Sequence, residues 1–562
     1  MKVLKHISAF LACFMLCTAG HAIQIRREPG HRIPEYILPT DPDNPALWTP
    51  TSSSILTRAA AAPGAYARND ISRFGVNHYP LVLVEFKNRS FSIHGKQALL
   101  DRYERIFNEH GYTDNTKYNH KGYQFQGATG SVSDYFTDQS YGQYTPIFDI
   151  IGPIRLSQDY SYYGEGAQGK DIHIDQLILE VLDSIISNNL ANISGYAING
   201  TIHQFSIIYA GQGENFQESD ANTIWPQASE KYFDKKSHPT IYNSGINHVK
   251  YACTCELFWD SDTILDGIGT FCHEFSHTLG LPDFYDTTPN ADNETNVAMG
   301  FWSLMDYGNY ENGGFSPVGY TAFEKYSLGW MNIEEITSSG SYHLNDISQQ
   351  PDPGKGIHTA YRLSTGNDNQ FIILENHIKT GWYKYHASEG LMVTAVDYNK
   401  DSWGKDNNVN TNPKRYHILP ADNNYKRNTN AGDLFPYQFT DSDGDHLIDS
   451  ITTKGKPELS INSVYPPMSI YNIAKDGNNV TFRVVKDIPS GIENRRNQQV
   501  SISVQDGTVS VTAPIGSAVT IHNISGKAVS EIQTTNPTQQ ISLPGRGIWI
   551  IKCGKTTRKV QL

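Results

Sequence analysis

Two histidines and a glutamate within five residues are the side chains of this sequence best suited to chemistry. His273 and His277 are four residues apart, so on a helix their rings would project from one face, one turn apart. Two imidazoles in this arrangement can bind one Zn²⁺, and Glu274 between them can reach a zinc-bound water. Zinc lowers the pKa of that water towards about 7, and the carboxylate can take its proton during attack on a carbonyl group.

The residues after the second histidine predict the position of a third ligand. Gly280 can adopt a positive φ and end the helix, and Pro282 cannot continue it. The chain then turns back, so Asp283 can approach the metal and leave a fourth position open for catalysis. Asp286 and Glu294 also follow the helix and are rival ligands. We prefer Asp283 because it comes directly after the turn at Gly280.

A half-buried helix must position these side chains. Apolar residues recur at roughly helical spacing at Ile264, Leu265, Ile268, Phe271 and Phe275. This pattern predicts a helix that begins at about Asp262, with Ser261 or Asp262 as its N-cap.

A second stretch, residues 300–308, contains a methionine and a tyrosine of interest. In a zinc protease, a methionine turn gives the histidines an apolar floor, and Met305 is the candidate here. Tyr307 could hydrogen-bond the oxyanion that develops during catalysis. The alternative is that Met305 is a core residue and Tyr307 a turn residue.

The motif HEFSHTLGLPD at 273–283, together with SLMDY at 303–307, resembles the immune inhibitor A family of secreted zinc metallopeptidases, a metzincin-like group. Matching stretches such as DYFTDQSYG at 134–142 and KYSLGW at 325–330 extend the resemblance over about 79–485. The resemblance implies a zincin fold, bound zinc and endopeptidase activity on protein or peptide substrates. Ser276, a polar residue within the motif, departs from the family pattern.

Residues 1–22 have the features of a secretory signal peptide, in which two lysines precede a short apolar run that ends in small residues. Cys13 and Cys17 within this run make a lipoprotein signal the alternative, although the residues before them fit a lipobox poorly. No later run reaches 18 apolar residues, so we predict no transmembrane segment. We therefore expect the protein to be secreted, extracellular or attached to the cell surface.

Four cysteines remain after the predicted cleavage, at Cys253, Cys255, Cys272 and Cys553. An exported chain meets an oxidising compartment, so a disulfide from Cys253 or Cys255 to Cys272 is one interpretation. Buried free thiols are the other.

The formal net charge is −13, and charged residues make up 18% of the chain. These values do not indicate nucleic-acid binding, which favours basic patches. The length of 562 residues predicts about three folded units.

We predict an α+β protein in which residues 71–334 form the zinc metallopeptidase catalytic domain. Before the metal helix, the apolar patterns predict strands over 80–86, 145–156 and 204–211 and helices over 97–107 and 171–188. Alternating apolar residues predict a β-rich accessory domain over 335–487. Residues 23–70, rich in Pro, Ala, Ser and Thr, are a leader or pro-segment.

Within the accessory region, carboxylates recur at Asp441, Asp443, Asp445 and Asp449. Such spacing suits Ca²⁺, which prefers oxygen ligands. His446 and Thr452 stand where an EF-hand loop needs glycine and glutamate, so the loop is at most a variant of that motif. A calcium site and a solvated acidic turn both remain open.

After a polar linker at 488–499, residues 500–562 form a short β module. Its stretches 521–526, 543–545 and 548–552 resemble the C-terminal sorting domains of the type IX secretion system, which are Ig-like sandwiches that carry cargo across an outer membrane. The resemblance implies the secretion machinery as a partner. A generic carbohydrate- or protein-binding sandwich is the alternative.

Together these features predict a secreted zinc endopeptidase with Glu274 as general base. The alternative from another class is a catalytically silent surface-binding protein on a zincin scaffold. An intact Glu274 favours the enzyme.

Overall fold

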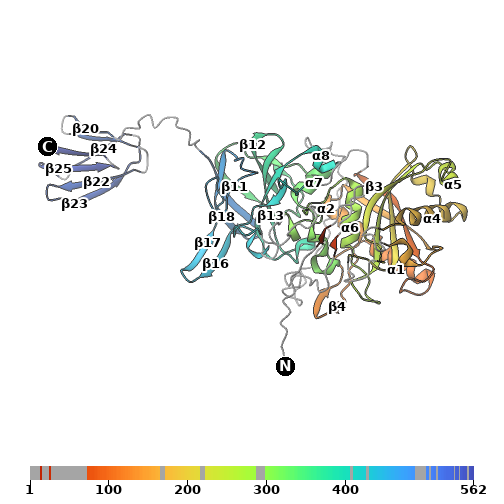
Figure 1. Cartoon of the computed structure of the whole chain (residues 1–562). Helices are drawn as coiled ribbons and strands as arrows, with labels where there is room; N and C mark the ends of the chain where they lie inside the picture. The colour runs from red at the N-terminus through yellow and green to blue at the C-terminus, as the bar shows by residue number, and fades with distance from the viewer. Residues whose placement is uncertain are drawn as a thin grey trace, which may run out of the picture. The chain divides into compact units, whose positions relative to one another are not determined.

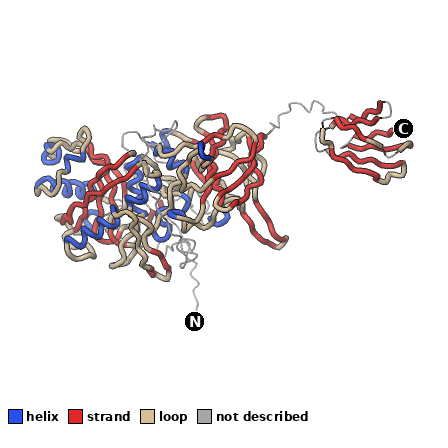
Figure 2. The backbone as a smooth tube through the Cα atoms, turned by 180° about the vertical axis from the view of Figure 1, so that it is seen from behind, coloured by secondary structure: helices blue, strands red, loops and turns tan. Residues whose placement is uncertain are grey.

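The computed structural model describes residues 13–14, 25–26, 73–164, 171–215, 222–286, 298–404, 409–425, 430–487, 501–505, 508–513, 517–536, 538–543, 545–553 and 556–561. The chain divides into two compact units, Met1–Asp487 and Ile488–Leu562 (Figures 1 and 2). The predicted signal peptide and leader lie outside the described residues, except for a two-residue pairing of β1 (Cys13–Phe14) with β2 (Ile25–Arg26). The predicted linker also lies outside them.

A five-stranded sheet is the framework of the region that carries the zinc motif. Its strands are β3 (Gly75–Glu85), β6 (Tyr144–Arg155), β7 (Thr201–Gln212), β8 (Gln227–Tyr232) and β9 (His248–Leu257), in the spatial order β6-β3-β7-β9-β8. The first four neighbours in this order run parallel, and the edge strand β8 is antiparallel to β9. The predicted mixture of strands and helices in this region is confirmed.

Helices cover both faces of this sheet (Figure 1). One face packs on α1 (Lys96–Asn108), α2 (Val132–Gln139) and α6 (Gly269–Leu279), and the other on α4 (Ile174–Ser187) and α5 (Pro239–Asn243). Leu81 and Leu83 of β3 belong to the first core, whereas Val82 and Val84 belong to the second. Because side chains alternate along a strand, the uninterrupted apolar run of β3 serves both cores.

The elements predicted for this region lie within a few residues of their expected positions. The strands predicted over 80–86, 145–156 and 204–211 are β3, β6 and β7, and the helices predicted over 97–107 and 171–188 are α1 and α4. Short elements complete the region: β4 (Lys117–His120), β5 (Tyr123–Gln126), α3 (Tyr160–Tyr163) and η3 (Ile193–Tyr196).

The second half of this unit is rich in strands, as predicted. One sheet has the order β10-β12-β13-β14-β15 and a second the order β11-β19-β18, and β16 and β17 form a hairpin. The bounds are β10 (Glu334–Glu335), β11 (Gly340–Leu344), β12 (Ala360–Asn367), β13 (Gln370–His377), β14 (Gly390–Asp397), β15 (Tyr416–Ile418), β16 (Tyr437–Asp441), β17 (Gly444–Ile448), β18 (Met468–Asp476) and β19 (Asn479–Lys486).

Short helices connect the two halves or lie among these strands: η4 (Gly300–Trp302), η5 (Tyr307–Gly314), α7 (Ala322–Leu328), η6 (Pro353–Lys355), η7 (Gly381–Tyr383), α8 (Lys400–Gly404) and η8 (Asn430–Gly432). One buried core contains Phe275 of α6 together with Phe371 of β13 and Met392 of β14. The zinc-motif region and the strand-rich region therefore share a core within one compact unit.

The second unit consists of two antiparallel sheets, β20-β21-β24 and β23-β22-β25-β26. Inward-facing residues of both sheets, such as Val509 and Ile551, form a core of their own. The bounds are β20 (Ser501–Gln505), β21 (Thr508–Thr512), β22 (Ala518–Asn523), β23 (Ala528–Gln533), β24 (Thr538–Ile541), β25 (Ile548–Cys553) and β26 (Thr556–Gln561).

The predicted start of the metal helix is wrong. The helix α6 begins at Gly269 rather than near Asp262. The residues before Gly269 instead pair with the end of β9. Leu265 forms a β-bridge with Leu257, and the Asp266 N–H donates a hydrogen bond to the Glu256 carbonyl. Ser261 accepts hydrogen bonds in a local turn and caps no helix.

The four cysteines of the predicted mature chain, Cys253, Cys255, Cys272 and Cys553, are buried free thiols. Cys253 and Cys255 belong to the core on one face of the sheet, and Cys272 to the core on the other. The sheet thus separates the thiols that sequence spacing had suggested as a disulfide pair. Among the described residues, no helix is both long and apolar enough to cross a membrane.

Candidate metal centre

The C-terminal end of α6 sets the geometry of the candidate site. Gly280 caps the helix with φ 106°, a left-handed conformation that glycine adopts without the cost of a Cβ atom. Its N–H donates to the Ser276 and His277 carbonyls, and the chain then reverses. The reversal returns Asp283 to the histidines, as the sequence predicted.

Three buried side chains converge at this reversal. Asp283 Oδ1 lies 3.2 Å from His273 Nε2 and 3.2 Å from His277 Nε2. Neither histidine Nε2 atom has a hydrogen-bond partner among the described residues, despite this proximity. Ligands at the ~2.0–2.2 Å bond lengths of tetrahedral zinc would lie about 3.3–3.5 Å from one another. The arrangement therefore fits donors that share a metal ion better than donors that bond to each other.

Hydrogen bonds at the opposite ring nitrogens fix both imidazoles. His273 Nδ1 lies 2.8 Å from the Leu304 carbonyl oxygen, and His277 Nδ1 lies 2.8 Å from the Leu281 carbonyl oxygen. A carbonyl only accepts, so each Nδ1 carries a proton, and each ring in its neutral form presents the Nε2 lone pair. This is the usual second-sphere arrangement of histidine ligands.

Without a bound cation, the burial of these three polar side chains would be unfavourable in free energy. Burial lowers the pKa of His273. Burial also acts against a charged His277, but the Asp283 carboxylate outweighs it and raises the pKa of His277 to about 9. For Asp283, burial acts to raise the pKa, and the nearby histidines hold it well below its usual value. A divalent cation would satisfy the carboxylate and both lone pairs at once.

Glu274 lies next to this group and is itself buried. Its carboxylate lies near the backbone N–H of Ala228 in the edge strand β8, which acts to lower its pKa, and Oε2 has no hydrogen-bond partner among the described residues. Burial raises the pKa of Glu274 to about 8. A carboxylate with this affinity for protons is suited to general base chemistry near neutral pH.

Met305 is fully buried in the core that also contains Phe275 and Leu279 of α6. Its turn is held by hydrogen bonds from Ser303 Oγ to Glu324 and from the Met305 N–H to Ser303 Oγ, at 2.5 Å and 3.1 Å. Leu304 of the same turn orients His273. The segment around Met305 thus positions one metal-facing imidazole as well as contributing to the core.

Two buried tyrosines lie on segments next to α6, namely the segment after Asp283 and η5. Tyr307 is 7% exposed and begins η5, which packs on α6. Tyr285 is 4% exposed and hydrogen-bonds to Asp283, and the charges of Asp283 and Glu274 add to burial in raising its pKa. Sequence reasoning missed Tyr285, although its place two residues after the candidate ligand was a signal for it.

Some of the predicted site residues lie outside the group of three metal-facing side chains. Among the described residues, His273, His277 and Asp283 are the only set of three His, Cys, Asp or Glu side chains with ligand atoms within 4.8 Å of one another. Asp286 is buried but is not a member, and Glu294 lies outside the described residues.

The four predicted calcium ligands lie on or beside the hairpin of β16 and β17 and do not form such a set: Asp441, Asp443, Asp445 and Asp449. Asp441 Oδ1 instead accepts from the Asp443 N–H at 2.8 Å and lies 2.8 Å from His446 Nε2. These contacts are those of a locally bonded acidic turn.

Comparison with known proteins gives two matches. Residues 77–334 match the family described as Immune inhibitor A peptidase M6, catalytic domain. The chain is also 24% identical over 298 residues to the Pre-pro-metalloprotease PrtV of two strains of Vibrio cholerae serotype O1, M66-2 and ATCC 39315 / El Tor Inaba N16961. This alignment covers 45% of the present chain and 29% of the length of PrtV.

The family match includes α6 and the group that converges at its end. A metallopeptidase of this kind implies a bound metal, typically zinc, and protein substrates. Together, the sequence matches and the His-His-Asp group support a metallopeptidase resembling immune inhibitor A over residues 77–334.

Proposed function

We propose that the protein is a secreted, zinc-dependent endopeptidase that hydrolyses peptide bonds of extracellular proteins. The buried convergence of His273, His277 and Asp283 beside Glu274 carries this proposal. These three side chains would hold zinc through His273 Nε2, His277 Nε2 and a carboxylate oxygen of Asp283. Zinc supplies a Lewis acid that polarises the scissile carbonyl and makes water a stronger nucleophile.

Glu274 acts as the general base. Its unpartnered Oε2 takes the proton of the attacking water, and the same carboxylate passes that proton to the leaving amine. Burial favours this role, because it raises the affinity of the carboxylate for a proton in transit. Tyr307 donates its hydroxyl proton in a hydrogen bond to the oxyanion that forms from the substrate carbonyl.

The edge strand β8 gives the substrate backbone a place to bind. It ends the five-stranded sheet, and its Ala228 N–H borders the Glu274 carboxylate. A peptide that extends along this edge would place its main chain next to the catalytic carboxylate. Recognition through the main chain accommodates internal bonds of many sequences, which suits an endopeptidase.

The domains of the proposed enzyme are those predicted from the sequence. Residues 71–334 form a zincin-like catalytic domain and residues 335–487 a β-rich accessory domain. Residues 1–22 direct export, residues 23–70 are a leader or pro-segment, and residues 488–499 link to an Ig-like sorting module at 500–562. Calcium at the β16–β17 hairpin is not part of the proposal.

Digestion of casein by the full chain tests the function. We expect internal cleavage that stops with 1,10-phenanthroline and returns with added Zn²⁺. A synthetic peptide blocked at both termini should also be cleaved, since an endopeptidase needs no free end. If preparations with full zinc content digest neither casein, gelatin nor the blocked peptide, the chain is a surface-binding protein on a zincin scaffold.

A further inference from the structure

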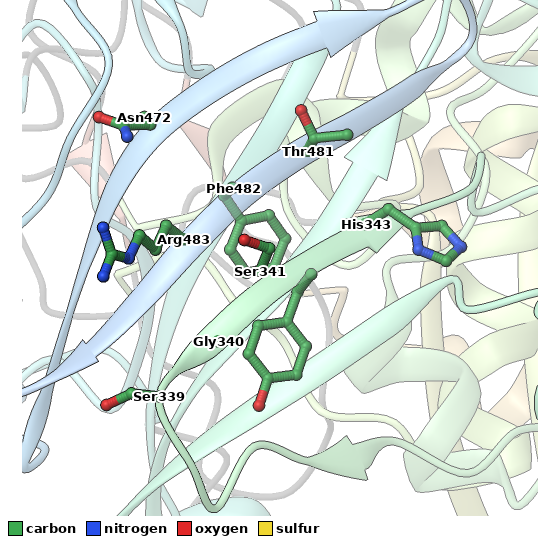
Figure 3. Close-up of a pocket in the computed structure, with 9 residues that line it drawn as sticks. Ser339, Gly340, Ser341, His343, Asn472, Thr481, Phe482 and Arg483 are labelled. Carbon is green, nitrogen blue, oxygen red and sulfur yellow. The ribbon is translucent and has the colours of Figure 1, made fainter.

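A solvent-open hollow of about 780 Å³ lies on the sheet β11-β19-β18, outside the metal centre (Figure 3). This volume falls within the roughly 300–1,000 Å³ of ligand sites. The inward face of the sheet, including Val480, Phe482 and Val484 of β19, is buried in a hydrophobic core. The hollow opens on the solvent-facing side, where β19 alternates to Thr481 and Arg483, and its lining also includes Tyr342 and Phe482.

The strand register brings polar side chains together on this outer face. Ser341 of β11 is directly opposite Arg483 of β19, and His343 is opposite Thr481. Figure 3 shows Arg483 and Asn472 towards one end of the hollow and His343 towards the other, with Ser341 between them. Because side chains alternate between the two faces of a strand, the four side chains of these two cross-strand pairs lie on the same face of the sheet.

A β-bulge aims Asn472 at this face. The register of β18 against β19 shifts between Tyr471 and Ala474, which leaves one extra residue on β18. Asn472 within the bulge has φ 53°, in the left-handed region that few residues other than glycine and asparagine adopt. Bulges commonly redirect a side chain at a functional position.

Several hydrogen-bonding groups in the hollow remain available. Arg483, Asn472 and Ser341 form no side-chain hydrogen bond or ion pair with the described residues. The described residues that line the hollow include no acidic side chain, although acidic residues outnumber basic ones by 58 to 45 in the chain. An anionic ligand would therefore meet a guanidinium and no opposing carboxylate in the lining.

The position of the hollow argues against a peptide as the occupant. It lies over β19, the central strand, whose neighbours β11 and β18 pair with it on both sides. β11 and β18 are the edge strands of this sheet, but a ligand seated over the face of β19 meets side chains rather than the unpaired main chain of either edge. A phosphorylated ligand would need more cationic groups than one arginine and one histidine.

Hydroxyl and amide side chains both donate and accept hydrogen bonds, which matches the hydroxyl groups of a sugar. Arginine binds a carboxylate through two parallel hydrogen bonds. We propose that the outer face of β11, β19 and β18 binds an acidic saccharide, with Arg483 on its carboxylate and Asn472 and Ser341 on neighbouring hydroxyls. This site is separate from the metal centre and goes beyond the proposed peptidase function.

Isothermal titration calorimetry of the full chain tests the site with three probes. Trigalacturonate and a hyaluronan tetrasaccharide both carry uronate carboxylates from different polymer sources, and chitotetraose is neutral. We expect at least one acidic probe to bind and chitotetraose not to bind. Lack of binding by both acidic probes, or equal binding by the neutral one, would overturn the proposal.

Single-residue variants then show where on the protein the acidic probe binds. Arg483→Gln should lower the affinity for the acidic probe by roughly tenfold or more, as expected for the loss of a charged hydrogen-bonded pair. Lys96→Gln removes one exposed positive charge at the start of α1 and should leave affinity unchanged. Equal affinity of Arg483→Gln and the wild-type protein would place the ligand elsewhere and contradict the proposal.

Asn472→Gly separates binding from folding. Glycine suits the left-handed conformation of residue 472, so this change should keep or raise the melting temperature. The Asn472→Gly change should still lower the affinity for the acidic probe about threefold or more, because the side-chain amide is lost. Unchanged affinity at an unchanged melting temperature would remove Asn472 from the site and would contradict the proposed contacts.

Discussion

At the metal centre, each histidine is fixed by a hydrogen bond at Nδ1 and presents Nε2 to the same point. The partners are the main-chain carbonyls of Leu281 and Leu304, which no side-chain substitution removes directly. Asp283 is oriented instead by a side chain, the hydroxyl of Tyr285. The Asp283 carboxylate is therefore the candidate ligand whose orientation is most easily altered by mutation.

Tyr285→Phe should weaken zinc binding by roughly 10–100-fold, the usual effect of removing a partner of a metal ligand. The ring and its packing remain, so the melting temperature of the metal-free protein should hardly change. Competition with a fluorescent zinc chelator measures the affinity without relying on activity. Wild-type affinity in this variant would show that Tyr285 does not orient the ligand.

Asp283→Ala should abolish stoichiometric zinc binding, whereas Asp286→Ala should retain it. Within the described part of the chain, Asp283 alone places a carboxylate oxygen 3.2 Å from both histidine Nε2 atoms. Elemental analysis of the two purified variants gives the zinc content, and Asp286→Ala serves as the matched control because this carboxylate is also buried. The reverse pattern would mean that Asp286 is the third ligand.

At the scale of elements, close backbone packing holds α6 in place. A Cβ atom on Gly269, the first residue of the helix, would lie 1.9 Å from the Asn309 carbonyl oxygen in η5. A Cβ atom on Gly267 would lie 2.2 Å from the backbone of Gly314. Because these neighbours are main-chain atoms, they cannot move aside as a flexible side chain could. The two glycines thus allow the metal helix to pack against η5.

Gly269→Ala should destabilise the first unit by at least the ~1–3 kcal/mol typical of overpacking. Chemical denaturation followed by tryptophan fluorescence measures the loss. Gly404→Ala is the control, since no heavy atom would lie within 4 Å of the new Cβ atom among the described residues. Equal stability of both variants would contradict the tight contact between α6 and η5.

The sequence predicted the end of α6 and not its beginning, for a physical reason. Gly280 and Pro282 act through local backbone conformation, which the residue types reveal directly. The beginning depends on Leu265, whose apolar side chain fits a helical pattern while its backbone pairs with Leu257. Such a tertiary contact is not visible in the periodicity. Tyr285 is one of 33 tyrosines, and only its place two residues after Asp283 distinguishes it in the sequence.

At the scale of the whole molecule, the described residues form two units with separate cores. The core around the metal helix includes residues of β13 and β14, so it extends beyond the predicted catalytic boundary at residue 334. The last unit has its own core of ten buried residues and shares none with the first. Removing the last unit should therefore leave the metal centre intact.

A chain truncated after Gln499 should keep its zinc and its cleavage of casein, because the first unit retains all its core residues. If residues 500–562 are a sorting module, the truncated chain should accumulate in the periplasm of the producing cell. Immunoblots of periplasmic and culture fractions compare it with the full chain. Normal secretion after truncation would refute the sorting role.

The central claim is that Glu274 is the base of a zinc peptidase. Glu274→Gln keeps the shape and hydrogen-bonding capacity of the side chain but cannot accept the proton of the attacking water. Tyr307→Phe, assayed alongside, removes one oxyanion donor and should lower kcat by roughly 10²-fold or more with KM little changed. An unchanged kcat in Tyr307→Phe would exclude that residue from the mechanism.

The most direct measurement is the kcat for a blocked peptide with wild-type protein and Glu274→Gln, with zinc content determined on the same preparations. We expect equal zinc content and a fall in kcat of at least the roughly 10²–10⁴-fold that general acid–base catalysis contributes. Equal melting temperatures would show that the variant is folded. Wild-type kcat in Glu274→Gln at full zinc occupancy would contradict the proposed mechanism.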